Sequence, residues 1–258
     1  MTVSPAHPSN EAQLDSPSYR IPALDQDFLL GDTMRGLRFQ IEYAKAEEAL
    51  RAYSVRSTIV VFGSARAREN GPNRQTFWYE QARSFGRLAS ERGGALMPHG
   101  AVRDNVIATG GGPGLMEAAN RGAAEAGAPN IGLNITLPQE QEPNAYSTPD
   151  LTFRFHYFAM RKMHFAMRAN ALVVFPGGFG TLDEMFEVLT LRQTGKQPYV
   201  PVVLFDERYW RKIIAFDALL EEGMVARSDL ELFSFAEDAE GVWAALLKRG
   251  LGQHRGPA

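Results

Sequence analysis

Residues 171–184 have the sequence Ala-Leu-Val-Val-Phe-Pro-Gly-Gly-Phe-Gly-Thr-Leu-Asp-Glu, which is an apolar run, a glycine turn and the start of a helical pattern. The same succession occurs twice earlier, where residues 58–62 precede Gly63-Ser64-Ala65 and residues 105–109 precede the glycine-rich turn 110–114. Short β-branched runs that alternate with helical segments indicate a parallel sheet. We therefore predict a single α/β domain with a three-layer αβα architecture, in which helices cover both faces of a Rossmann-like, doubly wound parallel sheet.

The rest of the chain extends this pattern. Apolar residues spaced three and four apart predict helices at 32–53, 75–92, 115–126, 151–168, 181–193, 209–222 and 239–248. Short apolar runs predict roughly six strands, at 58–62, 105–109, 131–137, 171–175, 200–205 and 232–235. Residues 94–103 break the alternation and are expected to form an inserted loop. Proline-rich polar residues 1–30 are expected to form an irregular or disordered arm and residues 252–258 a tail, which leaves one domain at residues 31–251.

The composition narrows the classes of function. A net charge of −3 gives no excess of Lys and Arg for duplex nucleic acid, so we expect no nucleic-acid partner and a phosphate site in a pocket. The chain contains no cysteine, which excludes disulfides, thiolate metal sites and a thiol nucleophile. The first ~20 residues do not resemble a secretory signal, and the apolar runs are too short to cross a bilayer. We therefore expect no membrane partner and a cytoplasmic location.

The three glycine turns are candidates for anion binding. A helix start leaves backbone N–H groups unpaired, and glycine lets a phosphate approach them closely. A doubly wound sheet binds its ligand where the winding direction reverses, and a strand order of 3-2-1-4-5 would place both the Gly63 turn and the Pro176 turn at that point. The candidate residues of the first two turns are Gly63, Ser64, Gly111 and Gly112. The alternative is that these glycines only permit tight turns and close packing of helices.

Two common nucleotide signatures are missing. The second turn fits a dinucleotide fingerprint only loosely, and the next strand contains Ile-Gly-Leu-Asn at residues 131–134 instead of ending in an acidic residue. No Gly-Lys-Ser or Gly-Lys-Thr follows any turn, so a Walker motif is excluded. The pattern therefore disfavours NAD as a ligand.

Charged residues beside the third turn are candidates for the chemistry. Glu184 is the first of these, although Thr181 three residues earlier also allows a capping box with it, which is a purely structural alternative. Glu187 lies on the same helix face as Glu184, so a carboxylate pair would consist of these two. Arg161 and Lys162, on an otherwise apolar helix, would hold a phosphate or orient a carboxylate. The alternative for both is a solvated edge of an amphipathic helix.

The two histidines of the same predicted helix, His156 and His164, are eight residues apart. They are accompanied by neither an H-E-x-x-H motif nor a carboxylate cluster. We therefore expect no metal site.

Residues 176–184, Pro-Gly-Gly-Phe-Gly-Thr-Leu-Asp-Glu, match the PGGxGTxxE signature of the Lonely Guy family, the cytokinin-activating phosphoribohydrolases. Residues 160–162 resemble the family's MxxRK-type helix motif, residues 110–117 its GGGPGLME turn, and residues 62–64 its first turn. The similarity extends from about residue 58 to residue 205. The N-terminal arm and the insert at 94–103 depart from the short plant-type members and are more similar to the longer bacterial branch.

The resemblance implies a homodimer that hydrolyses nucleoside 5′-monophosphates, AMP or its N6-prenylated relatives, to free base and ribose 5-phosphate. For the longer bacterial branch, turnover of plain AMP is the expectation. By the same resemblance Arg161 and Glu184 form the catalytic pair, with the phosphate held by Gly177, Gly178, Gly180 and Thr181. We expect no cofactor.

The available residues agree with this chemistry. Breaking an N-glycosidic bond builds positive charge on the ribose, and a fixed carboxylate at Glu184 would stabilise that charge. Arg161, paired with Glu184 or with the phosphate, is expected to keep the carboxylate ionised. Two other hypotheses stay open: a nucleotide-binding sensor without turnover, and a pyridoxal-phosphate lyase with Lys162 as the Schiff-base residue.

Overall fold

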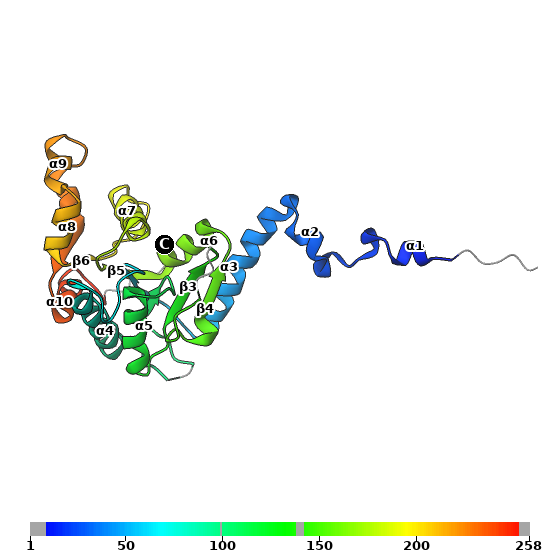
Figure 1. Cartoon of the computed structure of the whole chain (residues 1–258), viewed down its shortest axis with the longest axis horizontal. Coiled ribbons are helices and arrows are strands. Elements are labelled where there is room, and N and C mark those ends of the chain that lie inside the picture. Colours follow the sequence, from blue (N-terminus) through cyan, green and yellow to red (C-terminus); the bar gives the residue numbers. More distant parts are fainter. Residues whose placement is uncertain (1–8, 99, 138–141, 253–258) are drawn as a thin grey trace, which may run out of the picture. The chain divides into compact units, whose positions relative to one another are not determined.

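A computed structural model describes residues 9–98, 100–137 and 142–252 (Figure 1). Contacts divide the chain into a small unit, Met1–Glu42, and a large unit, Tyr43–Ala258. The small unit contains α1 (Glu11–Leu14), α2 (Gln26–Leu30) and three short 3₁₀ turns, at Pro17–Tyr19, Pro22–Leu24 and Asp32–Met34. None of these five elements buries a residue. The next helix, α3 (Arg35–Ala52), continues from the small unit into the large one.

The predicted division of the chain at residues 30 and 252 stays a prediction. Residues 1–8 of the expected arm and residues 253–258 of the expected tail lie outside the described residues. The expected loop at 94–103, apart from residue 99, contains no helix or strand in its described part. Its last residue, Arg103, forms an isolated bridge with Val55 and donates a hydrogen bond of 2.8 Å to the carbonyl of Tyr53.

The large unit is built on a seven-stranded sheet in which all neighbouring strands are parallel. The strands are β1 (Thr58–Phe62), β2 (Val106–Thr109), β3 (Ile131–Ile135), β4 (Thr152–Phe155), β5 (Ala169–Val174), β6 (Val202–Phe205) and β7 (Phe233–Ala236). Their order is β4-β3-β2-β1-β5-β6-β7, so the chain winds outward from β1 to one edge and then returns past β1 to the other. The winding reverses between β1 and β5, which confirms the predicted doubly wound sheet.

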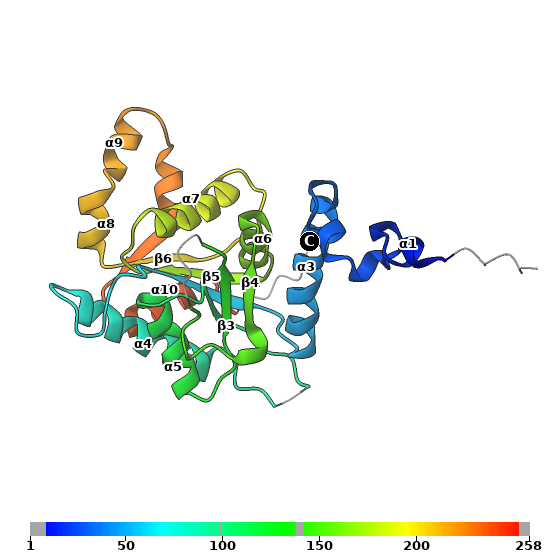
Figure 2. The same cartoon turned by 45° about the vertical axis from the view of Figure 1, so that its right-hand side comes forward.

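Helices cover both faces of this sheet (Figure 2). One layer consists of α4 (Gln75–Arg92), α5 (Leu115–Glu125) and α10 (Ala239–Lys248). The opposite layer consists of the C-terminal part of α3, α6 (Phe158–Arg168), α7 (Phe179–Gln193), α8 (Glu207–Ile213) and α9 (Phe216–Glu221). Two 3₁₀ turns, at Pro149–Leu151 and Arg227–Leu232, complete the described elements.

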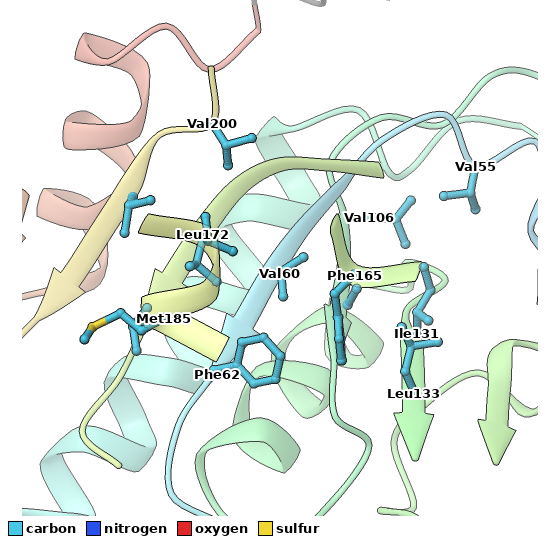
Figure 3. Packing of buried hydrophobic residues seen from close by; sticks show 14 of the residues in the cluster. Val55, Val60, Phe62, Val106, Ile131, Leu133, Phe165, Leu172, Met185 and Val200 are labelled. Carbon is cyan, nitrogen blue, oxygen red and sulfur yellow. The ribbon is translucent and has the colours of Figure 1, made fainter. Parts of the chain in front are cut away.

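Alternate residues of the central strands pack into separate cores on the two faces. In β1, Ile59 and Val61 join the cluster beneath α4 and α5, while Val60 and Phe62 join the cluster beneath α6 and α7. Figure 3 shows the cluster beneath α6 and α7. In it, the ring centres of Phe62 and Phe165 are 4.7 Å apart. Burying each such side chain contributes about 1.5–3 kcal/mol. A strand covered on both faces has no polar side, which explains the continuous apolar runs in the sequence.

The predicted helix at 151–168 is wrong in its first part, because Thr152–Phe155 is strand β4 and the helix begins only at Phe158. Phe153 and Phe155 are buried while Arg154 between them is exposed, which is the period of two of a strand. The predicted helix at 209–222 is interrupted between Ile213 and Phe216 and forms α8 and α9.

Within the described residues, no helix is both long and apolar enough to cross a bilayer.

Candidate active site

A cleft of about 690 Å³ opens beyond the carboxyl ends of β1 and β5. The first glycine turn supplies Gly63 and Ser64 to its wall, and the third turn with the start of α7 supplies residues 177–184. Arg161 of α6 also lines it. The reversal of winding between β1 and β5 therefore gathers residues from three distant segments of the chain, as expected for this type of sheet.

The start of α7 presents unpaired backbone donors to the cleft. The helix begins at Phe179 with Gly178 as its N-cap, and no side chain caps it. Within the part of the chain that the structure describes, the N–H groups of residues 177–181 have no hydrogen-bond partner. Because the helix begins before Thr181, the capping-box explanation of Thr181 and Glu184 is wrong. The unpaired donors and the helix dipole favour an anion at this position.

The glycines of the first and third turns differ in what surrounds them. A Cβ atom at Gly178 or Gly180 would meet nothing within 4 Å, so close packing does not require glycine at these two positions. At Gly177 an added Cβ would collide with the side chain of Thr181, and at Gly63 it would lie 2.7 Å from Cβ of Leu115. Packing therefore explains Gly63 and Gly177, whereas Gly178 and Gly180, whose own N–H groups are unpaired, border open space.

Glu184 is a buried acid at the wall of the cleft. Its residue is 5% exposed, and among the described residues it has no hydrogen bond and no ion pair. Burial raises the pKa of Glu184 to about 7, against the opposing charges of Lys162 and Arg161, which lower it. Arg161 does not hold this carboxyl fully ionised, contrary to expectation. Burial raises the pKa of this unpaired carboxyl by more than the two cations lower it, because neither cation is in contact with it.

Arg161 is held in place by the sheet. Its Nε donates a hydrogen bond of 2.8 Å to the carbonyl of Leu133 in β3, and its guanidinium lies 5.3 Å from the ring centre of Phe165. Gly110 lies against the guanidinium, where a larger residue would collide with it. Burial lowers the pKa of Arg161 below its usual range, although the charges of Glu184 and Asp183 oppose this shift.

Lys162 and Glu187 lie next to the cleft but do not line it. The Lys162 ammonium is 2.8 Å from a carboxylate oxygen of Asp183 and 2.9 Å from one of Glu187. Burial lowers the pKa of Lys162, but the hydrogen bonds to both carboxylates outweigh this effect and raise it above its ordinary value. A Schiff-base lysine must be neutral to attack a carbonyl. The position of Lys162 therefore does not fit the pyridoxal-phosphate hypothesis.

The second glycine turn lies away from the cleft wall. Gly111 and Gly112 are buried and do not line the cleft. Gly111 has a φ of 70° and lies against Asn134, where a Cβ atom would collide. Asn144 closes this turn, since its N–H donates to the Gly111 carbonyl at 2.8 Å and its amide donates to the Gly112 carbonyl at 3.2 Å. Packing accounts for glycine at position 111, and Asn144 holds the carbonyls of both residues in place.

The two histidines do not share a helix, contrary to the predicted helix at 151–168. His156 precedes α6, whereas His164 is buried within the helix, between the rings of Tyr43 and Phe155. In the described segments, His, Asp and Glu side chains form no group of three that could hold a metal ion.

Several residues of the cleft were not found by sequence reasoning. Tyr209 of α8 lines the cleft, and its hydroxyl donates a hydrogen bond of 2.8 Å to the carbonyl of Gly177. Arg66 follows the first glycine turn, is exposed, and forms no ion pair with any described residue. Apolar lining comes from Met116, Phe158 and Ile213. Met116 belongs to the GGGPGLME turn, although the motif does not indicate that its side chain lines the cleft. The other residues belong to no recognisable motif, so only the fold reveals them.

The doubly wound sheet, the uncapped glycine-rich helix start and the buried acid define a Rossmann-like α/β protein with a cleft at the carboxyl ends of its central strands. A family model described as "Possible lysine decarboxylase" matches residues 116–246, just over half of the chain. This is the family of the Lonely Guy proteins, and the chain belongs to it. The match includes Arg161, Glu184 and Tyr209 but not the first glycine turn.

Curated relatives of the chain carry the name cytokinin riboside 5′-monophosphate phosphoribohydrolase. LOG3 of Arabidopsis thaliana is 27% identical over 139 residues, which are 53% of this chain and 63% of the relative. The Rhodococcoides fascians protein of the same name is 32% identical over 92 residues, 35% of this chain and 46% of the relative. The chain thus spans less than two thirds of the length of either relative.

A similar fold occurs in the X-ray structure of TM1055, a structural genomics target. The two structures superpose with a TM-score of 0.52 at 19% sequence identity. The match covers 74% of this chain and 99% of the other. This similarity supports the Rossmann-like fold.

Proposed function

We propose that the protein hydrolyses the N-glycosidic bond of nucleoside 5′-monophosphates, AMP or N6-modified AMP, and releases the free base and ribose 5-phosphate. The proposal includes the expected homodimer and cytoplasmic location. One observation carries it: the cleft that presents the free amides of residues 177–181 also contains the buried, unpaired carboxyl of Glu184. The names of the curated relatives support the same activity.

The free amides at the start of α7 would bind the substrate's 5′-phosphate. Glu184 lies one helical turn beyond them, so a bound phosphate would bring the attached ribose towards its carboxyl. Binding energy from the phosphate, which does not react, would then position C1′ for attack. The apolar side chains of Met116, Phe158 and Ile213 supply a surface for the base.

In the reaction, water adds to C1′ as the bond from C1′ to the base nitrogen breaks, and the electron pair of that bond leaves with the base. The water proton passes to the Glu184 carboxylate and then to the base, so the enzyme returns to its starting state. A group with a pKa of about 7 is suited to this transfer at neutral pH. The carboxylate also stabilises the positive charge that develops on the ribose. Lys162 and Arg161 both oppose the effect of burial on the pKa of Glu184, so part of the carboxyl is ionised at neutral pH.

The direct test is the Glu184→Gln variant with AMP as substrate and released adenine as readout. Glutamine keeps the shape of the side chain but neither accepts the proton nor carries charge, so we expect kcat to fall by about 10²- to 10⁴-fold. Glu221→Gln, an exposed change on α9, is the matched control and should retain full activity.

A folded Glu184→Gln protein with full activity would contradict the proposal. Saturable AMP binding by the unmodified protein without adenine release would instead support the sensor hypothesis. Nucleosides without a phosphate should react poorly beside their monophosphates, because they lack the group that the α7 amides would bind.

A further inference from the structure

The three carbonyl groups that precede α7 each accept a hydrogen bond from the protein. The N–H of Ser64 donates to the Pro176 carbonyl at 3.0 Å, and the N–H of Leu182 donates to the Gly178 carbonyl at 2.9 Å. Between them, the Tyr209 hydroxyl donates to the Gly177 carbonyl at 2.8 Å. Two of these donors are backbone groups, so Tyr209 is the one side chain among them.

Fixing a carbonyl also fixes the N–H of the next residue. A trans peptide is planar, and its C=O and N–H point in opposite directions. The hydrogen bond from Tyr209 therefore determines the direction of the Gly178 N–H. This peptide joins Gly177 to Gly178, and two glycines in succession give the backbone its greatest freedom to rotate. Of the three peptides, it is the one that most needs an external contact to hold it.

Tyr209 is itself held by a buried carboxylate. Asp206, 1% exposed, is the N-cap of α8 and accepts a hydrogen bond of 3.2 Å from the N–H of Tyr209. The indole N–H of Trp78 in α4 donates to the same carboxylate at 2.7 Å. The rings of Trp78 and Tyr209 meet edge to face, 5.5 Å between centres. The hydroxyl of Tyr209 is thus placed by contacts from both α4 and α8.

We propose that Tyr209 is a positioning residue for the substrate's phosphate. Its hydroxyl fixes the peptide between Gly177 and Gly178, so that the Gly178 N–H stays directed at the anion with the neighbouring free amides. This inference rests on the proposed function, because it assigns Tyr209 to the phosphate end of the same cleft. Tyr209 acts through the backbone and takes no part in the proton transfer.

The test is Tyr209→Phe, which removes the hydroxyl and keeps the ring beside Trp78. We expect the Kd for ribose 5-phosphate, measured by calorimetry, and the KM for AMP to rise about three- to tenfold, the usual effect of losing one hydrogen bond. The kcat for AMP and the inhibition constant of adenosine, which has no phosphate, should change less than about twofold. Tyr53→Phe is the matched control, because it removes a hydroxyl that donates to Asp150 at 2.8 Å, outside the cleft.

The measurements distinguish a failure of the role proposed for Tyr209 from a failure of the proposed hydrolase activity. Unchanged affinity of Tyr209→Phe for ribose 5-phosphate would overturn the inference, and so would an equal loss for adenosine, which indicates a general structural defect. If the unmodified protein binds ribose 5-phosphate but releases no adenine, the proposed function fails while the comparison of Tyr209→Phe with Tyr53→Phe still decides the inference. If the unmodified protein binds no phosphate ligand, both claims are wrong.

Discussion

Glu184 and Glu47 are buried acids with opposite surroundings. Glu47 accepts hydrogen bonds from Arg168 at 2.6 Å and from Arg51 at 2.7 Å. Burial raises the pKa of Glu47, but the two guanidinium groups outweigh burial and hold it below its ordinary value. Glu184 has no such partner among the described residues, and its pKa rises to about 7. A buried carboxyl without a partner destabilises the fold, and a raised pKa beside a cleft is typical of a functional group.

The raised pKa of Glu184 predicts that the stability of the protein depends on pH. Because the pKa of Glu184 is higher in the folded protein than its ordinary value of 4.5, the unfolded chain loses this proton first as the pH rises. The free energy of unfolding therefore falls between about pH 4.5 and pH 7 by up to about 3 kcal/mol from this group. Glu184→Gln removes the effect, so the variant should gain stability relative to the unmodified protein across that range. Urea unfolding at several pH values measures the difference.

Glu221→Gln serves as the control in the same series, since it makes the same change at an exposed side chain. Its stability should follow that of the unmodified protein at every pH. A constant difference between Glu184→Gln and the unmodified protein from pH 4.5 to pH 8 would contradict the raised pKa.

At the scale of elements, the first turn of α7 contains a residue of low helix propensity, Gly180, at a position where a larger side chain would fit. Gly180 lies in its first turn, and an added Cβ would meet nothing within 4 Å. Replacing a helical glycine by alanine stabilises a helix by about 0.5–1 kcal/mol. Glycine at this position therefore lowers the stability of α7, which is understandable if a ligand must approach the amides.

Gly180→Ala should accordingly raise the free energy of unfolding by about 0.5–1 kcal/mol. It should also raise the KM for AMP, because a phosphate bound at this helix start would have to approach a backbone that now carries a methyl group. Gly36→Ala is the matched control: Gly36 is also in the first turn of a helix, α3, with nothing within 4 Å of an added Cβ. It should gain similar stability without a change in KM. If Gly180→Ala binds AMP as the unmodified protein does, the phosphate does not lie at this helix start.

The same elements show what the sequence could predict. The strands before the first and third glycine turns were predicted within two residues, because a buried parallel strand leaves a continuous apolar run and glycine marks its end. Strand β4 was missed because α6 begins only three residues after it, so the apolar residues of the strand were read as the first turn of the helix. The start of α7 was misplaced because Thr181 and Glu184 imitate a capping box, while the true N-cap is Gly178.

The candidate site was predictable to a similar extent. Arg161 and Glu184 are part of recognisable motifs, and the winding of the sheet brings them to one cleft. Tyr209 lies more than twenty residues beyond the last motif, and its contact with Gly177 depends on where α8 packs. The pKa of Glu184 was also unpredictable, because it depends on burial and on the absence of a contact with Arg161.

At the scale of the whole molecule, the doubly wound sheet is what unites the site. Segments around residues 63, 161, 180 and 209 reach a single cleft because β1 and β5 are neighbours on either side of the reversal of winding. The family match to residues 116–246 contains three of these four segments. Within the large unit, we therefore propose that the phosphate lies at the start of α7 and the ribose beside Glu184.

A crystal structure of Glu184→Gln with AMP tests this claim most directly, since a slow variant should retain intact nucleotide. We expect the phosphate to accept hydrogen bonds from the amides of residues 177–181 and the side chain at position 184 to lie beside C1′ of the ribose. A nucleotide bound outside the cleft, or a side chain at position 184 turned away from the ribose, would contradict it.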